Sequence, residues 1–276
     1  MPRIFIAGCG FVGLATARLF HERGWEVIGG SHSAKLTGEP FATITVDIGD
    51  RAALASHGEL RGLDAVIHCA SSGRGGLGSY RRVYLDGARH LAEVLTPRHL
   101  LFTSSTSVYA QTDGAWVTEE SAAAPDRETG RVLRETEELV LARGGTVARL
   151  AGIYGPGRSV LLKKFLSGEA TIEGEGGRWI NQAHRDDIAP ALLLLVERGT
   201  RGIFNVADDK PMTQREVYAW LAEHFEKPLP PSGPIDTNRK RGVTSKRVRN
   251  ARLRAQGWAP RYPSFCDAVS GGSLLS

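Results

Sequence analysis

Short apolar runs alternate with amphipathic stretches along the first two thirds of the chain. Runs rich in Val, Ile and Leu, each followed by a polar or Gly-rich turn, predict β-strands at 4–7, 26–29, 43–46, 65–70, 100–104 and 147–150. Apolar residues at helical spacing predict helices between them at 11–23, 51–57, 80–96, 129–142 and 187–198. This alternation is typical of βαβ units. We therefore predict an α/β fold with a doubly wound parallel sheet, that is, a Rossmann fold.

The pattern loosens after residue 150, where glycines interrupt the periodicity, and a further strand at 203–206 is expected to rejoin the sheet. Thr213 and Glu216 have the spacing of a helix capping box. The predicted domains are a dinucleotide-binding domain at 1–150, with 179–206 rejoining it, and a smaller interleaved substrate lobe at 151–178 and 207–276.

The composition is that of a globular protein, with 276 residues, 41% of them hydrophobic and 24% charged. Its three cysteines lack CxxC spacing, which argues against a disulfide framework and against a zinc site, and favours a reducing compartment. No apolar run is long enough to span a bilayer. We therefore expect a cytoplasmic protein with neither a metal nor a membrane partner.

The charge is unevenly distributed. Residues 237–266 contain nine Lys or Arg and no acid, so the rest of the chain, with 26 basic and 30 acidic residues, has a net charge of −4. A basic segment on a mildly acidic body predicts one site for a small anionic partner, and a solvated basic helix face is the alternative. Nucleic acid is not expected, because Trp258 and Tyr262 are too few aromatics for a stacking platform.

A GxGxxG sequence directly follows the first predicted strand and opens the first predicted helix. Gly8 would permit the tight turn, Gly10 the approach of a pyrophosphate, and Gly13 close packing of helix on sheet. Phe11 and Val12 lie in the same turn, at the helix N-terminus on which the phosphates would rest. The motif predicts a dinucleotide site; the alternative is a Gly-rich turn without a ligand.

The second predicted strand indicates which dinucleotide is bound. NAD sites usually have Asp or Glu after this strand, about 20 residues beyond the glycines. Here the strand is followed by Ser31, His32 and, three residues further on, Lys35, which supply hydroxyl groups and potential cations for a 2′-phosphate. The sequence favours NADP, with NAD as the alternative.

Five short segments follow one another along the chain: DIGD at 47–50, VIHCA at 66–70, FTSSTSVY at 102–109, RLAGIYGPG at 149–157 and HRDD at 184–187. In this order they resemble the extended short-chain dehydrogenase/reductases, also called the NAD-dependent epimerase/dehydratase family. The resemblance implies that Asp47 and Ile48 lie on the adenine side of the cofactor, and that Cys69 and Ala70 line its site at the end of the fourth strand. It also implies that Ser105 orients the substrate.

The catalytic Tyr-x-x-x-Lys pair of that family is missing. In the family pattern, Thr129 stands in place of the tyrosine and Leu133 in place of the lysine, and no tyrosine lies four residues before any of the seven lysines. A threonine cannot ionise near neutral pH. In this respect the chain resembles the atypical YeeZ-like branch of the family.

Several other residues are candidates for the missing chemistry. Tyr109 and Tyr154 are candidate proton donors, and packing beneath a loop or in a turn is the alternative for each. His184 and Arg74 are candidate substrate contacts, the first on the HRDD segment and the second on a Gly-rich loop. The basic tail resembles the family's substrate lobe, which implies substrate contacts by Lys246 and Arg247.

We therefore expect an NADP-binding, epimerase/dehydratase-like oxidoreductase that acts on a phosphorylated or nucleotide-linked small molecule. The alternative is a non-catalytic regulatory protein that senses NADP and has lost the catalytic pair. A homodimer remains open, since the sequence does not fix the oligomeric state.

Overall fold

The computed structural model describes residues 1–33, 36–73, 75–237 and 243–274. A seven-stranded sheet forms the centre of the larger lobe, in the order β12-β7-β5-β4-β1-β2-β3. Its strands are β1 (Arg3–Ala7), β2 (Glu26–Ser31), β3 (Ala42–Thr45), β4 (Ala65–His68), β5 (His99–Ser105), β7 (Thr146–Leu150) and β12 (Gly202–Val206). All neighbouring strands in this sheet run parallel. The predicted doubly wound sheet is confirmed.

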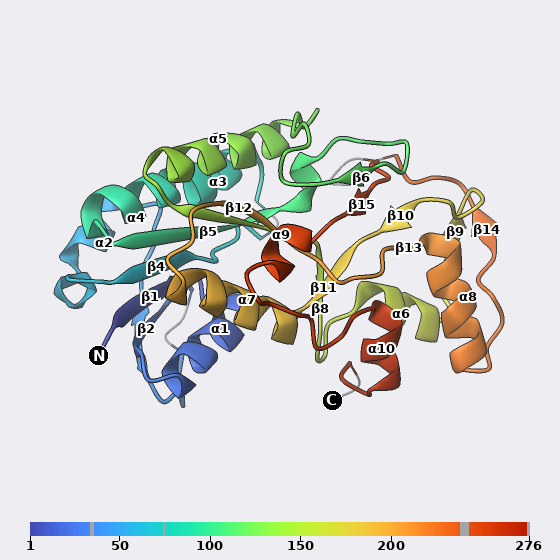
Figure 1. The fold of residues 1–276 in the computed structure, drawn as a ribbon, viewed down its shortest axis with the longest axis horizontal. Coiled ribbons are helices and arrows are strands. Elements are labelled where there is room, and N and C mark those ends of the chain that lie inside the picture. Colours follow the sequence, from blue (N-terminus) through green and yellow to red (C-terminus); the bar gives the residue numbers. More distant parts are fainter. Residues whose placement is uncertain (34–35, 74, 238–242, 275–276) are drawn as a thin grey trace.

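Helices cover both faces of this sheet (Figure 1). One face carries α1 (Phe11–Glu22) and α7 (Arg185–Glu197), which pack on each other. The other face carries α2 (Arg51–Ser56), α3 (Leu77–Arg81), α4 (Gly87–Leu95) and α5 (Glu128–Ala142). The order of the strands reverses between β1 and β4, so the loops after these two strands open at one crevice, where ligands bind in such sheets.

The helix predicted at 80–96 is three consecutive segments, because a π-helical turn at Arg82–Asp86 separates α3 from α4. The carbonyl oxygen of Val83 in this turn lies 3.0 Å from Nε2 of the buried His68 on β4. A side chain that enters the hydrogen-bond ladder of a helix locally changes its period. Hydrophobic periodicity alone does not reveal such a turn.

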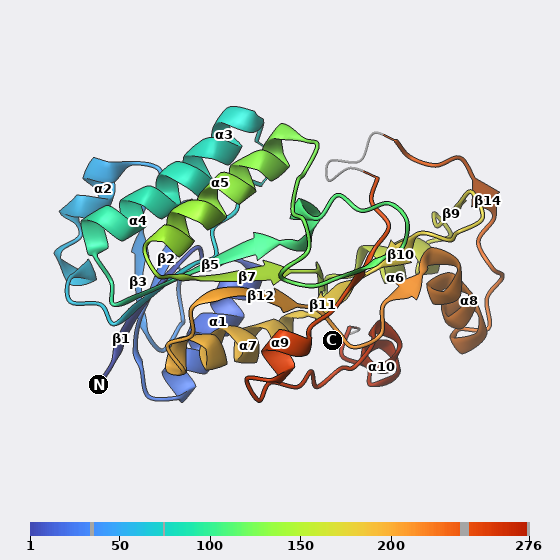
Figure 2. The ribbon, with the colours of Figure 1, turned by 45° about the horizontal axis from the view of Figure 1, so that its top comes forward.

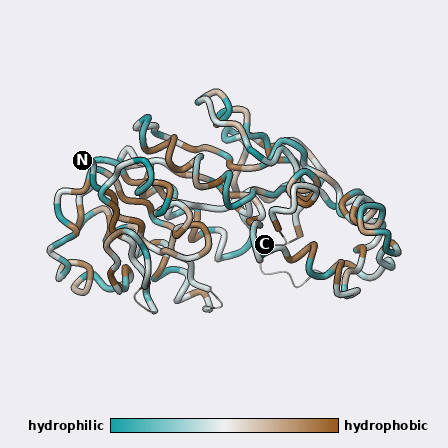
Figure 3. The backbone as a smooth tube through the Cα atoms, turned by 90° about the horizontal axis from the view of Figure 1, so that it is seen from below, coloured by the Kyte–Doolittle hydropathy of each residue, from teal (hydrophilic) through white to brown (hydrophobic). Residues whose placement is uncertain are grey.

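The larger core lies between the sheet and its helices. Ile4–Ala7 of β1, Val66 and Ile67 of β4, and Leu101 and Phe102 of β5 are fully buried. Strands covered on both faces have continuous apolar runs, and the tube in Figure 3 is accordingly brown along the central strands.

A smaller lobe lies beside the carboxyl ends of the strands (Figure 2). It contains α6 (Val160–Leu166), α8 (Gln214–His224) and α10 (Phe265–Ser270), whose side chains Phe165, Leu221 and Phe265 share a second core. Four strand pairs frame it: β8 (Gly152–Tyr154) with β11 (Gln182–His184), β9 (Ile172–Glu173) with β14 (Ser232–Gly233), β10 (Trp179–Ile180) with β13 (Met212–Thr213), and β6 (Trp116–Val117) with β15 (Arg247–Val248). The predicted capping box of Thr213 and Glu216 opens α8.

Residues after β8 contribute to both cores. β10 and β11 pair outside the large sheet, so the chain returns to it with α7 and β12 and not already at residue 179. Near the C-terminus, Leu253 of α9 (Ala251–Arg254) and Trp258 pack in the larger core. Among the described residues, no helix is both long and apolar enough for a membrane span.

Candidate active site

The Gly-rich turn after β1 has the backbone that a dinucleotide requires. Gly8 has φ +105°, and a Cβ there would lie 2.3 Å from the backbone nitrogen of Ala70. A Cβ on Gly13 would lie 2.1 Å from the carbonyl oxygen of Gly8, so Gly13 permits the close packing of α1 on the turn. At Gly10, by contrast, a Cβ would meet nothing within 4 Å. Gly8 and Gly13 are thus required by the fold, whereas Gly10 borders open space at the N-terminus of α1, which leaves room for a pyrophosphate.

Two guanidinium groups that the sequence analysis did not single out lie beside this turn. Those of Arg158 and Arg185 are each 5.0 Å from the centre of the Phe11 ring. Arg158 follows β8 and Arg185 opens α7, so residues distant in sequence bring positive charge to the turn. No spacing in the sequence indicates this, because the contact depends on how the smaller lobe meets α1.

Asp47 and Ile48, the residues expected on the adenine side, lie just after β3. The Asp47 carboxylate accepts a hydrogen bond of 2.9 Å from the Gly49 N–H, forms an ion pair with Arg82, and lies 3.4 Å from Nε2 of His32. Burial alone would raise the pKa of Asp47, but these hydrogen bonds and positive charges lower it. Ile48 is buried beside it.

The end of β2 determines the surroundings of an adenosine ribose. β2 ends at Ser31, and the next residue, His32, has an exposed side chain. No carboxylate occupies 31–33. Lys35 lies outside the described residues.

The thiols near the turn are not reactive groups. Burial raises the pKa of both Cys9 and Cys69 to about 12, so both are neutral at physiological pH. Cys69 and Ala70 follow β4, and Ala70 closes against Gly8.

A cavity of about 460 Å³ opens next to the loop after β4. Its wall includes Gly73 of that loop, Thr129 of α5, Arg158 and Ser107. Thr129, which stands in the tyrosine position of the family pattern, therefore lines this cavity, whereas Leu133 one turn later is buried. Arg74 lies outside the described residues.

Ser105 ends β5 and lines a second cavity of about 270 Å³. Its hydroxyl oxygen accepts a hydrogen bond of 3.2 Å from the Ser107 N–H, which caps the short helix η3 (Thr106–Val108). Ser107 and Thr244 line both cavities, so the two adjoin. Lys246 also lines the second cavity, which brings a residue of the basic tail next to Ser105.

The two tyrosine candidates are corrected by the structure. Tyr109 is fully buried, and its hydroxyl donates to Asn205 and accepts from Arg149, each over 2.9 Å. Tyr154 is buried against the rings of Phe265 and His184. Burial raises the pKa of both tyrosines, and neither lines the two cavities. Both side chains are parts of the packed interior.

Two expected substrate contacts are also corrected. His184 is buried, and its Nδ1 accepts a hydrogen bond of 3.1 Å from the Asp186 N–H at the start of α7. Burial lowers the pKa of His184 to about 4, so it is a neutral helix cap. Arg247 stacks between Trp116 and Trp179, 5.0 and 4.9 Å from the ring centres. Lys246 lines the second cavity, whereas Arg247 lines neither of the two cavities.

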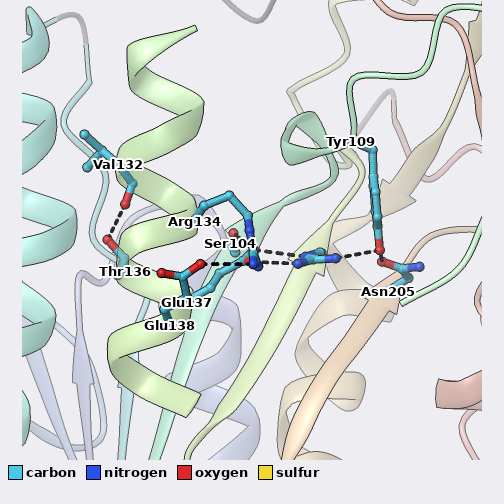
Figure 4. Close-up of polar contacts among 9 residues, drawn as sticks. Ser104, Tyr109, Val132, Arg134, Thr136, Glu137, Glu138 and Asn205 are labelled. Atoms are coloured by element: carbon cyan, nitrogen blue, oxygen red, sulfur yellow. Dashed lines mark hydrogen bonds and ion pairs between the residues drawn. The ribbon is translucent and has the colours of Figure 1, made fainter. Parts of the chain in front are cut away.

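A buried polar network connects α5 with β5 and β7 (Figure 4). Glu137 of α5 and Arg149 of β7 form a two-pronged ion pair with N···O distances of 3.0 and 2.7 Å. The Ser104 hydroxyl donates to the same carboxylate over 2.6 Å, and Arg134 also pairs with it. Burial alone would lower the pKa of Arg149. The hydrogen bonds to Glu137 and its negative charge have the larger effect together, so the pKa of Arg149 is raised. The network fixes α5, β5 and β7, and with them Thr129 and Ser105.

The fold and the Gly-rich turn together define a dinucleotide-binding protein of the Rossmann type. The model of the NAD dependent epimerase/dehydratase family matches residues 4–207. The chain therefore belongs to this family, as its motifs predict.

Individual proteins support this assignment. The chain is 30% identical over 243 residues to Protein YeeZ of Escherichia coli K12, which covers 80% of this chain and 83% of YeeZ. A solved putative NAD-dependent epimerase/dehydratase from Methylobacillus flagellatus is 29% identical, with a TM-score of 0.82 over 99% of this chain and 97% of that one. MoeE5, solved with UDP-glucuronic acid and NAD, shares the fold at 19% identity, with a TM-score of 0.79 over 100% of this chain and 98% of that one.

Proposed function

We propose that this protein is an NAD(P)-dependent oxidoreductase of the epimerase/dehydratase type that acts on a small anionic molecule, either phosphorylated or nucleotide-linked. We call the Gly-rich turn Gly8–Gly13, which is open at Gly10, the cradle. The observation that carries the proposal is that the cradle and the cavity beside Ser105 lie at the same edge of one sheet. When bound, the nicotinamide would accept or donate a hydride. The chain would supply the cradle, and the guanidinium of Arg158 would add positive charge beside it. The hydroxyl of Ser105 would orient the reacting oxygen of the substrate.

We further propose that NADP is preferred over NAD. Ser31 and His32 stand at the end of β2, where NAD sites usually have a carboxylate, and Asp47, the nearby acid, is paired with Arg82. Calorimetric titration with NADPH and NADH tests this preference: the affinity for NADPH should be several-fold higher. Equal affinities would contradict it without affecting the dinucleotide site itself.

The competing function is a regulatory protein that senses NADP without catalysis. The buried Leu133 favours it, because no ammonium group can stand at that position to lower the pKa of a proton donor at residue 129. A screen of sugar phosphates and sugar nucleotides separates the two, if it follows both the absorbance of the reduced nicotinamide and the products by chromatography, because an epimerase or dehydratase regenerates its cofactor within each turnover. Turnover supports the enzyme, whereas tight NADPH binding without turnover on any substrate supports the sensor.

A further inference from the structure

The cavity beside Ser105 is lined by two basic side chains from different segments, Arg178 before β10 and Lys246 before β15. No Asp or Glu is among the described residues that line it. We call it the cationic cavity. At about 270 Å³ it is smaller than the 300–1,000 Å³ typical of a pocket for a whole ligand, so it suits one group of a larger molecule.

Lys246 is buried without an anionic partner. Its side chain is part of a residue only 5% exposed, and its Nζ donates to the carbonyl oxygen of Tyr109 and to the hydroxyl of Thr244, each over 2.9 Å. Both acceptors are neutral, and no ion pair of Lys246 occurs within the described ranges. An ammonium group has three protons to donate, so these two bonds leave one donor for a ligand. Burial, and then the charge of Arg178, lower the pKa of Lys246 to about 8.

Arg178, which is partly buried, also lacks an anionic partner among the described residues. Its Nε is buried and has no hydrogen-bond partner among the described residues, and no ion pair to its guanidinium occurs among them. Burial lowers its pKa, although a guanidinium remains charged at physiological pH. A buried donor without a partner and a charge without a counter-ion are both unfavourable until a ligand satisfies them.

The two segments are held together before any ligand binds. The Asn181 side chain donates to the carbonyl oxygen of Lys246 over 2.8 Å and accepts from the Val248 N–H over 2.7 Å. The Trp179 N–H donates to the Ser245 hydroxyl over 3.2 Å. The cations therefore do not have to be gathered by the ligand, which reduces the entropy cost of binding.

We propose that the cationic cavity binds the anionic group of the substrate, a carboxylate or a phosphate, between Arg178 and Lys246, and so directs the rest of the molecule past Ser105 into the adjoining 460 Å³ cavity. The proposal rests on the proposed function in that it names the chemical group by which the substrate is held. Two like charges that face one small cavity repel each other, and a bound anion removes this repulsion and satisfies the free donors.

Calorimetry on the full chain tests the cavity with inorganic phosphate, sulfate and acetate. Titrations are made with and without saturating NADPH, because the cradle at Gly10 can itself bind free phosphate. With NADPH present, phosphate or acetate should bind, and Arg178→Gln and Lys246→Gln should each weaken binding about tenfold or more. Tighter binding of phosphate indicates a phosphorylated substrate, and tighter binding of acetate a carboxylate. Lys163→Gln on α6 and Arg143→Gln after α5, both exposed, are the matched controls and should change nothing.

A pH series adds a measurement that does not depend on the folding of a variant. Sulfate keeps its charge across this range, so its affinity should fall as the pH rises through about 8 and Lys246 loses its proton. The step should be absent in Lys246→Gln. A flat profile in the wild type, or full anion affinity in both variants, would overturn the cationic cavity while leaving a nucleotide-binding enzyme intact. Failure of NADPH to bind would instead overturn the proposed function.

Discussion

Neutralising Glu137 should destabilise the whole protein, because this carboxylate is fully buried between two guanidinium groups. Glu137→Gln keeps the size of the side chain but turns an NH₂ group toward the donors of Arg149 or Arg134. Removing one partner of a buried ion pair costs about 3–5 kcal/mol. At about 2 °C per kcal/mol for a chain of this size, the melting temperature should fall by about 6–10 °C.

Urea unfolding followed by tryptophan fluorescence measures this loss. Glu138→Gln is the matched control, since Glu138 is the next residue of α5, is exposed, and pairs with Arg134 at 3.3 Å. Exposed pairs contribute about 0–1 kcal/mol, so this variant should unfold nearly as the wild type does.

A double variant distinguishes loss of the pair from loss of packing. Glu137→Leu with Arg149→Met removes both charges, and the Tyr109 hydroxyl keeps Asn205 as its acceptor. It should be more stable than Glu137→Gln, because no charge is left buried alone. The reasoning is refuted if Glu137→Gln lies within about 1 kcal/mol of the wild type, or if the double variant loses the sum of the two single losses.

Three further outcomes are expected. Gly10→Leu should abolish binding of NADPH and NADH in calorimetry yet leave the melting temperature nearly unchanged, since a Cβ there meets no protein atom within 4 Å; undiminished binding would remove the cradle assignment. Ser105→Ala should lower turnover about ten- to a thousandfold at unchanged dinucleotide affinity, as measured by steady-state kinetics, and normal turnover would make the hydroxyl purely a cap of η3. Because the folded state lowers the pKa of Lys246 from 10.5 to about 8, the unfolded chain binds more protons between these values. The ligand-free wild type should therefore gain up to about 3 kcal/mol as the pH rises across this window, and Lys246→Met should lose that gain in urea unfolding at each pH.

The sequence predicts the large sheet well because its signals are local. The central strands are buried on both faces, so they read as continuous apolar runs. Gly8 and Gly13 stand together in the turn of one βα unit, although the atoms that require Gly8 belong to Ala70 and Cys69 after β4. Ser105 and Thr129 could likewise be placed by motif, since each stands at the end of a regular element.

The smaller lobe and the cations of the site could not be predicted in the same way. Arg158, Arg178 and Arg185 reach the site through contacts between segments far apart in sequence, and Arg178 follows glycines that read as an ordinary loop. Which of Lys246 and Arg247 lines the cavity depends on the pairing of β15 with β6, and each of these strands has only two residues. Burial also decided against Tyr109, Tyr154 and His184, and a titratable residue type does not reveal its burial.

Because β6 pairs with β15, which lies near the end of the sequence, this pair can form only late in the synthesis of the chain. The cradle of Gly8–Gly13 and its partner Ala70 are made in about the first quarter of synthesis, whereas Lys246 and the strand that carries Arg247 come near its end. A chain interrupted between these points therefore contains the whole Gly-rich turn and its partner Ala70 but lacks the Lys246 of the cationic cavity. An interruption after Trp179 also leaves the rings of Trp116 and Trp179 without the guanidinium that stacks between them, and apolar surface left exposed on an incomplete chain favours aggregation.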